Sequence, residues 1–314
     1  MQRSLMPPSA DILRLRRRRG PEIAIIAEPR DSHAAWLKKA FRKMGSRASI
    51  VQFASFAFAS DDPAGVTCVG GLPQSVLVRT VPGGAFEAVT RRLSILHALR
   101  ELGVQVWNDA RAIERCVDKS LASFLVQRAG LPTPTTWAIE DRAQAAAICA
   151  AELARGPLVL KPLFGSQGRG LRLITTVEDL PPPEELGGVY YLQRFAGNDE
   201  GGFHDYRVLV SGGRALAAMR RTGAGWITNV KRGGRPDAIP LSGDFRRLAL
   251  GAARAVGADF CGVDIIVPRG AEPMILEVNS MPAWSGLQKV TDFSLAEAIA
   301  ADFLAARAVH SKAV

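Results

Sequence analysis

Three oxygen-bearing side chains near the C-terminus could together hold a metal ion. Glu277 and Asn279 stand two residues apart in a strand-like pattern, so their side chains share one face of that strand. Asp264 belongs to the preceding strand-like segment. If the two strands form a hairpin that is symmetric about Gly270 and Ala271, Asp264 lies directly opposite Glu277. Carboxylate and amide oxygens suit Mg²⁺ or Mn²⁺, carried in with substrate phosphates.

An ordinary acidic sheet face, exposed to solvent, is the alternative interpretation of these acids. The apolar residues that flank them on both strands are Val263, Ile265, Ile275 and Val278. Such flanks favour a buried sheet. Two buried carboxylates that face each other repel unless a cation lies between them. The pattern therefore predicts a metal site rather than a solvated surface.

A glycine-rich loop, GSQGRG at 165–170, follows a strand-like segment that ends in Lys161 and Pro162. Glycines let the backbone approach a ligand closely, and its N–H groups can close over phosphate oxygens. The loop is not a Walker A loop, since no GK[ST] ends it, and not a dinucleotide fingerprint, since no helix follows. Taken alone, the glycine-rich loop is equally consistent with a flexible hairpin that binds no ligand. With Lys161 beside it, we expect a β-hairpin lid over a nucleotide.

Strands alternate with helices over the first 110 residues. The expected strands cover 22–28, 48–53, 75–80 and 103–107, and the expected helices cover 33–44 and 86–102. Such alternation is typical of a βαβ layer with a mainly parallel sheet.

The rest of the chain contains two further groups of elements. Helices are expected over 111–130, 143–155, 248–256 and 294–308, and strands over 136–139, 157–162, 171–175, 190–195, 204–210, 215–221, 261–267 and 273–278. Three prolines at 181–183 mark the expected boundary between two lobes. The expected domains are a basic arm at 1–20, an N-terminal α/β domain at 21–110, a small lobe with the glycine-rich lid at 111–188 and a C-terminal lobe with the metal site at 189–314.

The composition is that of a globular protein. The chain has 314 residues, of which 47% are hydrophobic and 22% are charged, and these values exclude a mainly disordered or fibrous protein. No apolar stretch reaches the roughly 18–20 residues of a membrane-spanning helix, so no membrane partner is expected. Arginines at 16–19 stand where a signal peptide would need an apolar core. The four cysteines have no metal-ligand or CxxC spacing, which favours reduced thiols and a cytoplasmic location.

The chain is strongly basic, with a net charge of +10. Such a surface attracts anions, which include nucleic acids, acidic membranes, nucleotides and polycarboxylates. Five arginines lie in 13–20, so part of the excess belongs to a terminal arm that we expect to be solvated. An RNA- or membrane-binding patch is the alternative. Because the run has no aromatic residue to stack on bases, nucleic acid is not expected as a partner.

Several short motifs follow one another in the order that is typical of a known superfamily. They are Asp118-Lys119-Ser120, Leu160-Lys161 with GSQGRG, Gln193-Arg194-Phe195, Asp205-Tyr206-Arg207, Thr228-Asn229, Lys231-Arg232-Gly233-Gly234, Gly262-Val263-Asp264 and Leu276-Glu277-Val278-Asn279. With these motifs the chain after about residue 111 resembles the ATP-grasp superfamily and, within it, the RimK-like glutamate ligases, which act on ribosomal proteins, lysine carriers or coenzymes. The resemblance implies an α/β and α+β fold in which an N-terminal βαβ pre-ATP-grasp domain precedes two α+β lobes that clamp ATP.

The resemblance also implies roles for single residues. ATP would be contacted by Lys119, Lys161, the loop residues Gly165, Ser166, Gln167, Gly168 and Gly170, the hinge residues Gln193, Arg194 and Phe195, and Asp205 near the ribose. Arg207, Arg221 and Asn229 would be catalytic, the two arginines near the γ-phosphate and the acyl phosphate, and Asp264, Glu277 and Asn279 would hold Mg²⁺ or Mn²⁺. One departure concerns Ile227, which stands two residues before Asn229 where many relatives carry arginine. The contacts to the acceptor or the nucleotide are therefore expected to differ.

The activity that the resemblance implies is the ATP-dependent joining of a carboxylate to an amine. The carboxylate attacks the γ-phosphate, an acyl phosphate forms, and the α-amino group of L-glutamate then expels phosphate. The expected acceptor bears a carboxylate and is a small coenzyme, such as a pterin- or furan-type one-carbon carrier, or an acidic protein tail. The alternatives are another amino acid as the amine and a non-catalytic protein that binds nucleotides or polyanions. The resemblance also allows a homo-oligomer.

Overall fold

The computed structural model describes residues 20–165, 168–197 and 202–313, the side chains of 311–313 excepted. The predicted basic arm at 1–20 therefore lies outside the described residues except for Gly20, and Ser166 and Gln167 of the predicted lid lie outside them too. The chain forms two compact units. We call Met1–Ala110 with Ala300–Val314 the N-terminal unit and Arg111–Ile299 the central unit. The predicted division into an arm, a domain and two lobes stays a prediction.

A parallel sheet forms the centre of the N-terminal unit, as the alternating pattern predicts. Its strands run in the order β2 (Ala48–Val51), β1 (Ile23–Ile26), β5 (Ser75–Val78) and β6 (Gln105–Trp107), and its helices are α1 (Ser32–Lys43) and α2 (Phe86–Glu101). A short hairpin of β3 (Phe56–Phe58) and β4 (Val66–Cys68) is not part of the prediction. Phe303 of the C-terminal helix α8 (Leu295–Ala313) packs edge-on against Phe41 and Trp107, with ring centroids 5.5 and 5.6 Å apart.

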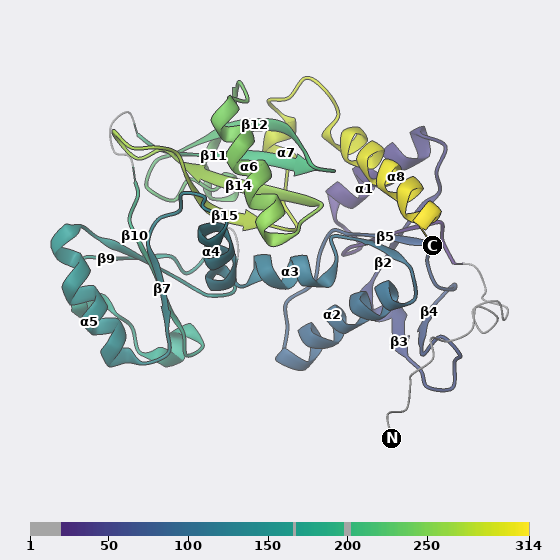
Figure 1. Ribbon diagram of the computed structural model, residues 1–314, viewed down its shortest axis with the longest axis horizontal. Helices are drawn as coiled ribbons and strands as arrows, with labels where there is room; N and C mark the ends of the chain where they lie inside the picture. The colour runs from purple at the N-terminus through teal and green to yellow at the C-terminus, as the bar shows by residue number, and fades with distance from the viewer. Residues whose placement is uncertain (1–19, 166–167, 198–201, 314) are drawn as a thin grey trace. The chain divides into compact units, whose positions relative to one another are not determined.

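The first sheet of the central unit has four antiparallel strands. Their order is β7 (Thr136–Ile139), β10 (Tyr190–Arg194), β8 (Leu158–Lys161) and β9 (Arg172–Ile174). Helix α5 (Arg142–Glu152) packs on this sheet through Ala145 and Cys149, which share a core with Leu158 and Leu160 (Figure 1). Strand β10 lies between β7 and β8, although the predicted boundary at 188 assigns it to the next lobe. The sheet therefore extends across the predicted boundary, because the place of a strand in a sheet depends on partners that are distant in sequence.

The second sheet of the central unit has five antiparallel strands, with charged residues on one face. Their order is β13 (Arg235–Ile239), β12 (Arg214–Gly223), β11 (Phe203–Ser211), β14 (Phe260–Ile266) and β15 (Met274–Asn279). Helix α6 (Gly243–Val256) covers one face, where Leu248 shares a core with Val208 and Val263 (Figure 1). Because side chains alternate along a strand, Arg207 and Asp264 lie on the opposite face. The prediction lacks β13, whose sequence RPDAI has no clear alternation of apolar residues.

Two helices replace the single helix that the sequence predicts over 111–130. Helix α3 (Ala110–Val117) ends before Asp118, and α4 (Lys119–Arg128) begins after it. The Asp118 carboxylate accepts hydrogen bonds from the backbone N–H groups of Ser120 and Leu121, at 2.8 and 3.1 Å, and so caps α4. This cap fixes Lys119 as the first residue of α4.

The remaining helical elements are short. They are η2 (Phe53–Ser55), η3 (Leu153–Arg155), η4 (Val177–Asp179), η5 (Pro183–Leu186), η6 (Val230–Arg232) and α7 (Ser285–Gln288). Among the helices of the described residues, none combines the length and the apolar composition that crossing a bilayer requires.

Candidate active site

A cleft in the central unit brings most of the predicted site residues together. It encloses about 860 Å³ of space, part of it open to solvent. The predicted residues that line it are Lys119, Lys161, Gly165, Gly168, Gln193, Arg194, Phe195, Asp205, Arg221, Asn229, Asp264 and Glu277. Gly170, Arg207 and Asn279 are described but do not line it.

Two lysines give the cleft positive charge. Lys161 ends β8, and its Nζ donates a hydrogen bond to Oε1 of Gln193 at 2.6 Å. Lys119 opens α4, and its Nζ donates to two carbonyl oxygens of the segment 163–165 at 3.2 and 3.0 Å. Burial lowers the pKa of Lys161 to about 8 and also lowers the pKa of Lys119, while Glu277 acts to raise both. Lys161 therefore carries its charge at neutral pH, where it can bind phosphate oxygens.

Apolar side chains line the cleft beside these lysines. The aliphatic ones are Val159, Leu171, Ile266 and Leu276. Phe195 and Trp226 meet edge to face, with ring centroids 6.0 Å apart. An apolar surface next to positive charge suits a nucleotide, which joins a planar base to phosphates.

The guanidinium of Arg194, a predicted ATP contact, is bound by a neighbouring acid. Its Nε and Nη2 donate to the Glu152 carboxylate at 2.6 and 3.1 Å, and its Cζ lies 5.8 Å from the centre of the Trp137 ring. Glu152 therefore neutralises the charge that Arg194 would otherwise offer to a phosphate. The sequence gives no signal for this pair, because Glu152 ends α5 far from β10 in the chain.

The glycine-rich loop connects β8 and β9 as an antiparallel hairpin, which confirms that part of the prediction. Gly168 has a φ of +68°, and a Cβ atom there would lie 2.5 Å from Oδ1 of Asn229 and 2.8 Å from Cγ2 of Ile227. Both the backbone conformation and this close contact exclude a side chain. The loop therefore touches the segment 227–229, and both line the cleft.

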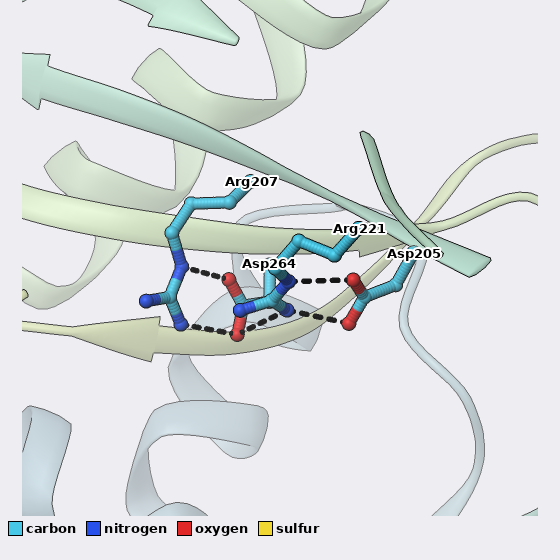
Figure 2. A network of polar contacts seen from close by, with 4 residues as sticks. All are labelled: Asp205, Arg207, Arg221 and Asp264. Carbon is cyan, nitrogen blue, oxygen red and sulfur yellow. Dashed lines mark hydrogen bonds and ion pairs between the residues drawn. The ribbon is translucent and has the colours of Figure 1, made fainter. Parts of the chain in front are cut away.

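Four charged residues form one network on the face opposite α6 (Figure 2). Arg207 pairs with Asp264 across β11 and β14, and its Nε and Nη2 donate to the two carboxylate oxygens at 2.6 and 2.7 Å. Arg221 donates to both oxygens of Asp205 at 2.6 and 2.5 Å, and its Nη2 lies 3.0 Å from Oδ2 of Asp264. Asp205, expected near a ribose, thus gives both oxygens to Arg221. Burial acts to raise the pKa of Asp264, but the two guanidinium groups outweigh it and hold that pKa below its usual value.

The acidic hairpin forms as predicted at its central pair. Asp264 faces Glu277, as a symmetric hairpin requires. Beyond this pair the register shifts by one residue, so that Ile265 faces Ile275 and the prediction is wrong there. The bulge lets Ile275 and Val278 both pack in the core with α6 while Glu277 lines the cleft.

The donor set of this hairpin fits Mg²⁺ or Mn²⁺, because Asp264, Glu277 and Asn279 offer only oxygen ligands. The described residues contain no group of three or more His, Cys, Asp or Glu side chains that could hold a metal. The amide of Asn279 and the substrate phosphates are therefore needed as further ligands. One correction concerns the charge argument: Arg207 and Arg221 both pair with Asp264, so the repulsion between Asp264 and Glu277 does not by itself require a cation.

A buried hydrogen bond that the sequence does not reveal joins two elements of the cleft. The hydroxyls of Ser123 on α4 and Tyr191 on β10 lie 2.8 Å apart. Burial raises the pKa of Tyr191 to about 12, so the phenol stays protonated. The bond ties the helix that carries Lys119 to the strand that carries Gln193.

Known proteins match this chain in sequence. The model of the RimK-like ATP-grasp domain matches residues 116–303, more than half of the chain. The chain is 35% identical over 246 residues to the tetrahydromethanopterin:alpha-L-glutamate ligase of Methanosarcina acetivorans, a match that covers 68% of this chain and 74% of the relative. It is also 35% identical over 231 residues to a probable alpha-L-glutamate ligase of Parasynechococcus marenigrum, covering 71% of this chain and 47% of the relative.

Solved structures match the fold over most of the chain. The ATP-grasp ligase PsnB, in complex with a variant of its minimal precursor, Mg and ADP, has a TM-score of 0.72 and 20% identity over 91% of this chain and 98% of that chain. A RimK domain ATP-grasp protein from Sphaerobacter thermophilus has a TM-score of 0.66 and 20% identity over 90% of this chain and 98% of that chain. At this identity the likeness shows the fold alone, and it confirms the predicted ATP-grasp fold.

Proposed function

The chain belongs to the RimK-like ATP-grasp family, and from this premise we propose that it joins the α-amino group of L-glutamate to a carboxylate of a small coenzyme. The protein is an ATP-grasp ligase that forms an amide bond and releases ADP. The observation that carries the proposal is the cleft itself. Two lysines, the carboxylates of Asp264 and Glu277 and the guanidinium of Arg221 line it together, within one unit of the chain.

In this proposal Lys119 and Lys161 bind the phosphates of ATP, while Gly168 brings the loop over them. The apolar wall beside Phe195 receives the adenine ring. Arg221, which lines the cleft, and Arg207, which pairs with Asp264 of the lining, bind the acceptor carboxylate and, later, its acyl phosphate. When bound, Mg²⁺ supplies Lewis-acid charge to the phosphates, held by the oxygen donors of the acidic hairpin.

The chemistry needs two displacements. An oxygen of the acceptor carboxylate attacks the γ-phosphorus, the bond to ADP breaks, and an acyl phosphate forms. The amine nitrogen of glutamate then attacks the acyl carbon, phosphate leaves with the bonding electrons, and the nitrogen loses a proton. Among the described residues that line the cleft, none is histidine or cysteine. The chain therefore contributes position and charge rather than acid–base or nucleophilic catalysis.

Relatives and charge support an acidic small molecule as the acceptor. Two relatives that are 35% and 33% identical are tetrahydromethanopterin:alpha-L-glutamate ligases, which supports a pterin-type coenzyme. A net charge of +10 favours an anionic acceptor, including one that already carries glutamate. The free cysteines among the described residues and the use of ATP support a cytoplasmic location.

The test is mass spectrometry of products from the purified protein, Mg-ATP, L-glutamate and a small-molecule extract of its own cells. We expect ATP-dependent species that are heavier by one or more glutamyl residues. Glu277→Gln should reduce turnover by about 10²-fold or more, since it removes a charge from the metal site. Glu272→Gln, on an exposed residue of the same hairpin, is the matched control and should leave turnover unchanged.

Three results would contradict the proposal. Adducts that form only with another amino acid would show that glutamate is not the amine. Adducts that form only on an acidic protein would show that the acceptor is not a small coenzyme. Nucleotide binding without any adduct, and unaffected by Glu277→Gln, would favour the non-catalytic alternative.

A further inference from the structure

Asp264 pairs with Arg207, and the two side chains are expected to bind different ligands: Asp264 a cation and Arg207 an anion. Both of its oxygens accept guanidinium N–H groups, from Arg207 at 2.6 and 2.7 Å and from Arg221 at 3.0 Å (Figure 2). Asp264 faces Glu277 on β15, so it is also one of the oxygen donors for a cation. The Asp264 carboxylate, which would bind a cation, is therefore already paired with the guanidinium groups that would bind an anion.

The two arginines differ in what remains when Asp264 is taken away. Arg221 keeps both oxygens of Asp205, at 2.6 and 2.5 Å. Arg207 makes its side-chain ion pair with Asp264 alone among the described residues. The side chains of Arg207 and Asp264 are only 13% and 7% exposed, so either charge is costly to leave without a partner. When a cation takes Asp264, Arg207 is therefore the arginine that needs another anionic partner.

We propose that a divalent cation on Asp264 and an anion on Arg207 bind cooperatively, because each takes one half of this internal ion pair. In the free protein the closed pair weakens both sites. A cation alone repels the nearby guanidinium and leaves it unpaired, and an anion alone does the same to the carboxylate. When both arrive, the buried charges exchange one partner for another, and no charge stays unpaired.

The coupling has a consequence for the joint binding of substrates in the cleft. The Arg207 guanidinium becomes more available to a carboxylate or phosphate when the metal-loaded nucleotide occupies Asp264, and Asp264 becomes more available to the metal when the anion is bound. The coupling thus favours the state in which the acidic substrate and the phosphoryl donor are bound together. The identity of the anion as the acceptor carboxylate rests on the proposed function, whereas the coupling itself does not.

The first test measures Mn²⁺ binding without nucleotide, by electron paramagnetic resonance, in the wild type and in Arg207→Gln. We expect the variant to bind Mn²⁺ about fivefold more tightly or more, since Asp264 loses its competitor. Arg220→Gln is the matched control: Arg220 neighbours Arg221 on β12 but pairs with Asp237, so Mn²⁺ binding should not change. Equal or weaker Mn²⁺ binding by Arg207→Gln would mean that the arginine merely orients Asp264, and would overturn the proposal.

The second test uses the other half of the pair and keeps the proposal falsifiable if Arg207→Gln fails to fold. Binding of inorganic phosphate is measured by calorimetry without metal, in the wild type and in Asp264→Asn. We expect tighter phosphate binding by the variant, again about fivefold or more, with no change in Asp237→Asn. An unchanged or lower phosphate affinity of Asp264→Asn would contradict the proposal that Asp264 competes with an anion for Arg207. Neither test uses glutamate or turnover, so failure of the proposed ligase reaction leaves both results interpretable.

Discussion

Single residues in the cleft owe their chemistry to burial and to nearby charge. Lys161 is the clearest case, since burial lowers its pKa to about 8 while the acids around it act in the opposite direction. An ammonium with this pKa is charged at neutral pH and loses its charge in a range where an exposed lysine keeps it. Among the described residues, its nearest partner is neutral, the Oε1 atom of Gln193.

We predict that nucleotide affinity falls as the pH rises through the pKa of Lys161. Below about pH 8 the charged lysine attracts phosphate, and the attraction is lost as the pH rises to about 9.5. Binding of a fluorescent ATP analogue, measured across this range, should weaken about tenfold in the wild type. Lys161→Gln should bind weakly throughout and show no such step. A wild-type affinity that does not change with pH would contradict the role of Lys161.

At the scale of elements, the start of α4 decides where Lys119 lies. Asp118 caps this helix through the N–H groups of Ser120 and Leu121. Asp141 caps α5 in the same way, through the N–H group of Gln144 at 2.7 Å, and does not line the cleft. The two caps are therefore alike in structure and differ in distance from the proposed phosphate site.

We predict that Asp118→Ala and Asp141→Ala each lower the free energy of unfolding by about 1 kcal/mol, as loss of an N-cap usually does. Only Asp118→Ala should also raise the KM for ATP, because fraying of the first turn of α4 releases Lys119. Denaturant titration and steady-state kinetics measure the two effects. Equal kinetic effects of the two variants would show that the change in KM follows from lost stability alone.

At the scale of the whole molecule, half of the net charge of +10 is concentrated in the first 19 residues. Residues 1–19 hold six arginines and one aspartate, a net +5, which leaves +5 for residues 20–314. The cleft lies wholly within the central unit, to which residues 1–19 do not belong. A net charge of this size attracts anionic substrates at long range.

We predict that kcat/KM for an acidic acceptor falls when the ionic strength rises from about 0.1 M to about 1 M, because screening shortens the reach of the charge from about 10 Å to about 3 Å. A variant without residues 1–19 should keep the same kcat and show a weaker dependence on salt. Kinetics at several salt concentrations measure both quantities. A variant with a much lower kcat would assign residues 1–19 to catalysis instead.

Local features of the fold follow from the amino-acid sequence alone. Turn residues and alternation place Asp264 opposite Glu277, and the glycines of 165–170 predict the hairpin between β8 and β9, because each is decided within a few residues of chain. The order of the motifs also predicts the ATP-grasp fold. Prediction of helix ends from local patterns fails where a polar residue interrupts a periodic segment. Asp118 does so between α3 and α4, where the sequence predicts one continuous helix.

The neighbours of each strand and the partners of each buried charge, in contrast, depend on the complete fold. Strand β10 joins the first sheet through partners on both sides, and no local pattern specifies that choice. Arg207 reaches Asp264 because β11 pairs with β14, which brings together residues 57 positions apart. The physical reason is that strand pairing and burial depend on the whole fold, whereas turns and alternation depend on neighbours in the chain. The ion pair between Arg207 and Asp264 is therefore a property of the folded protein alone.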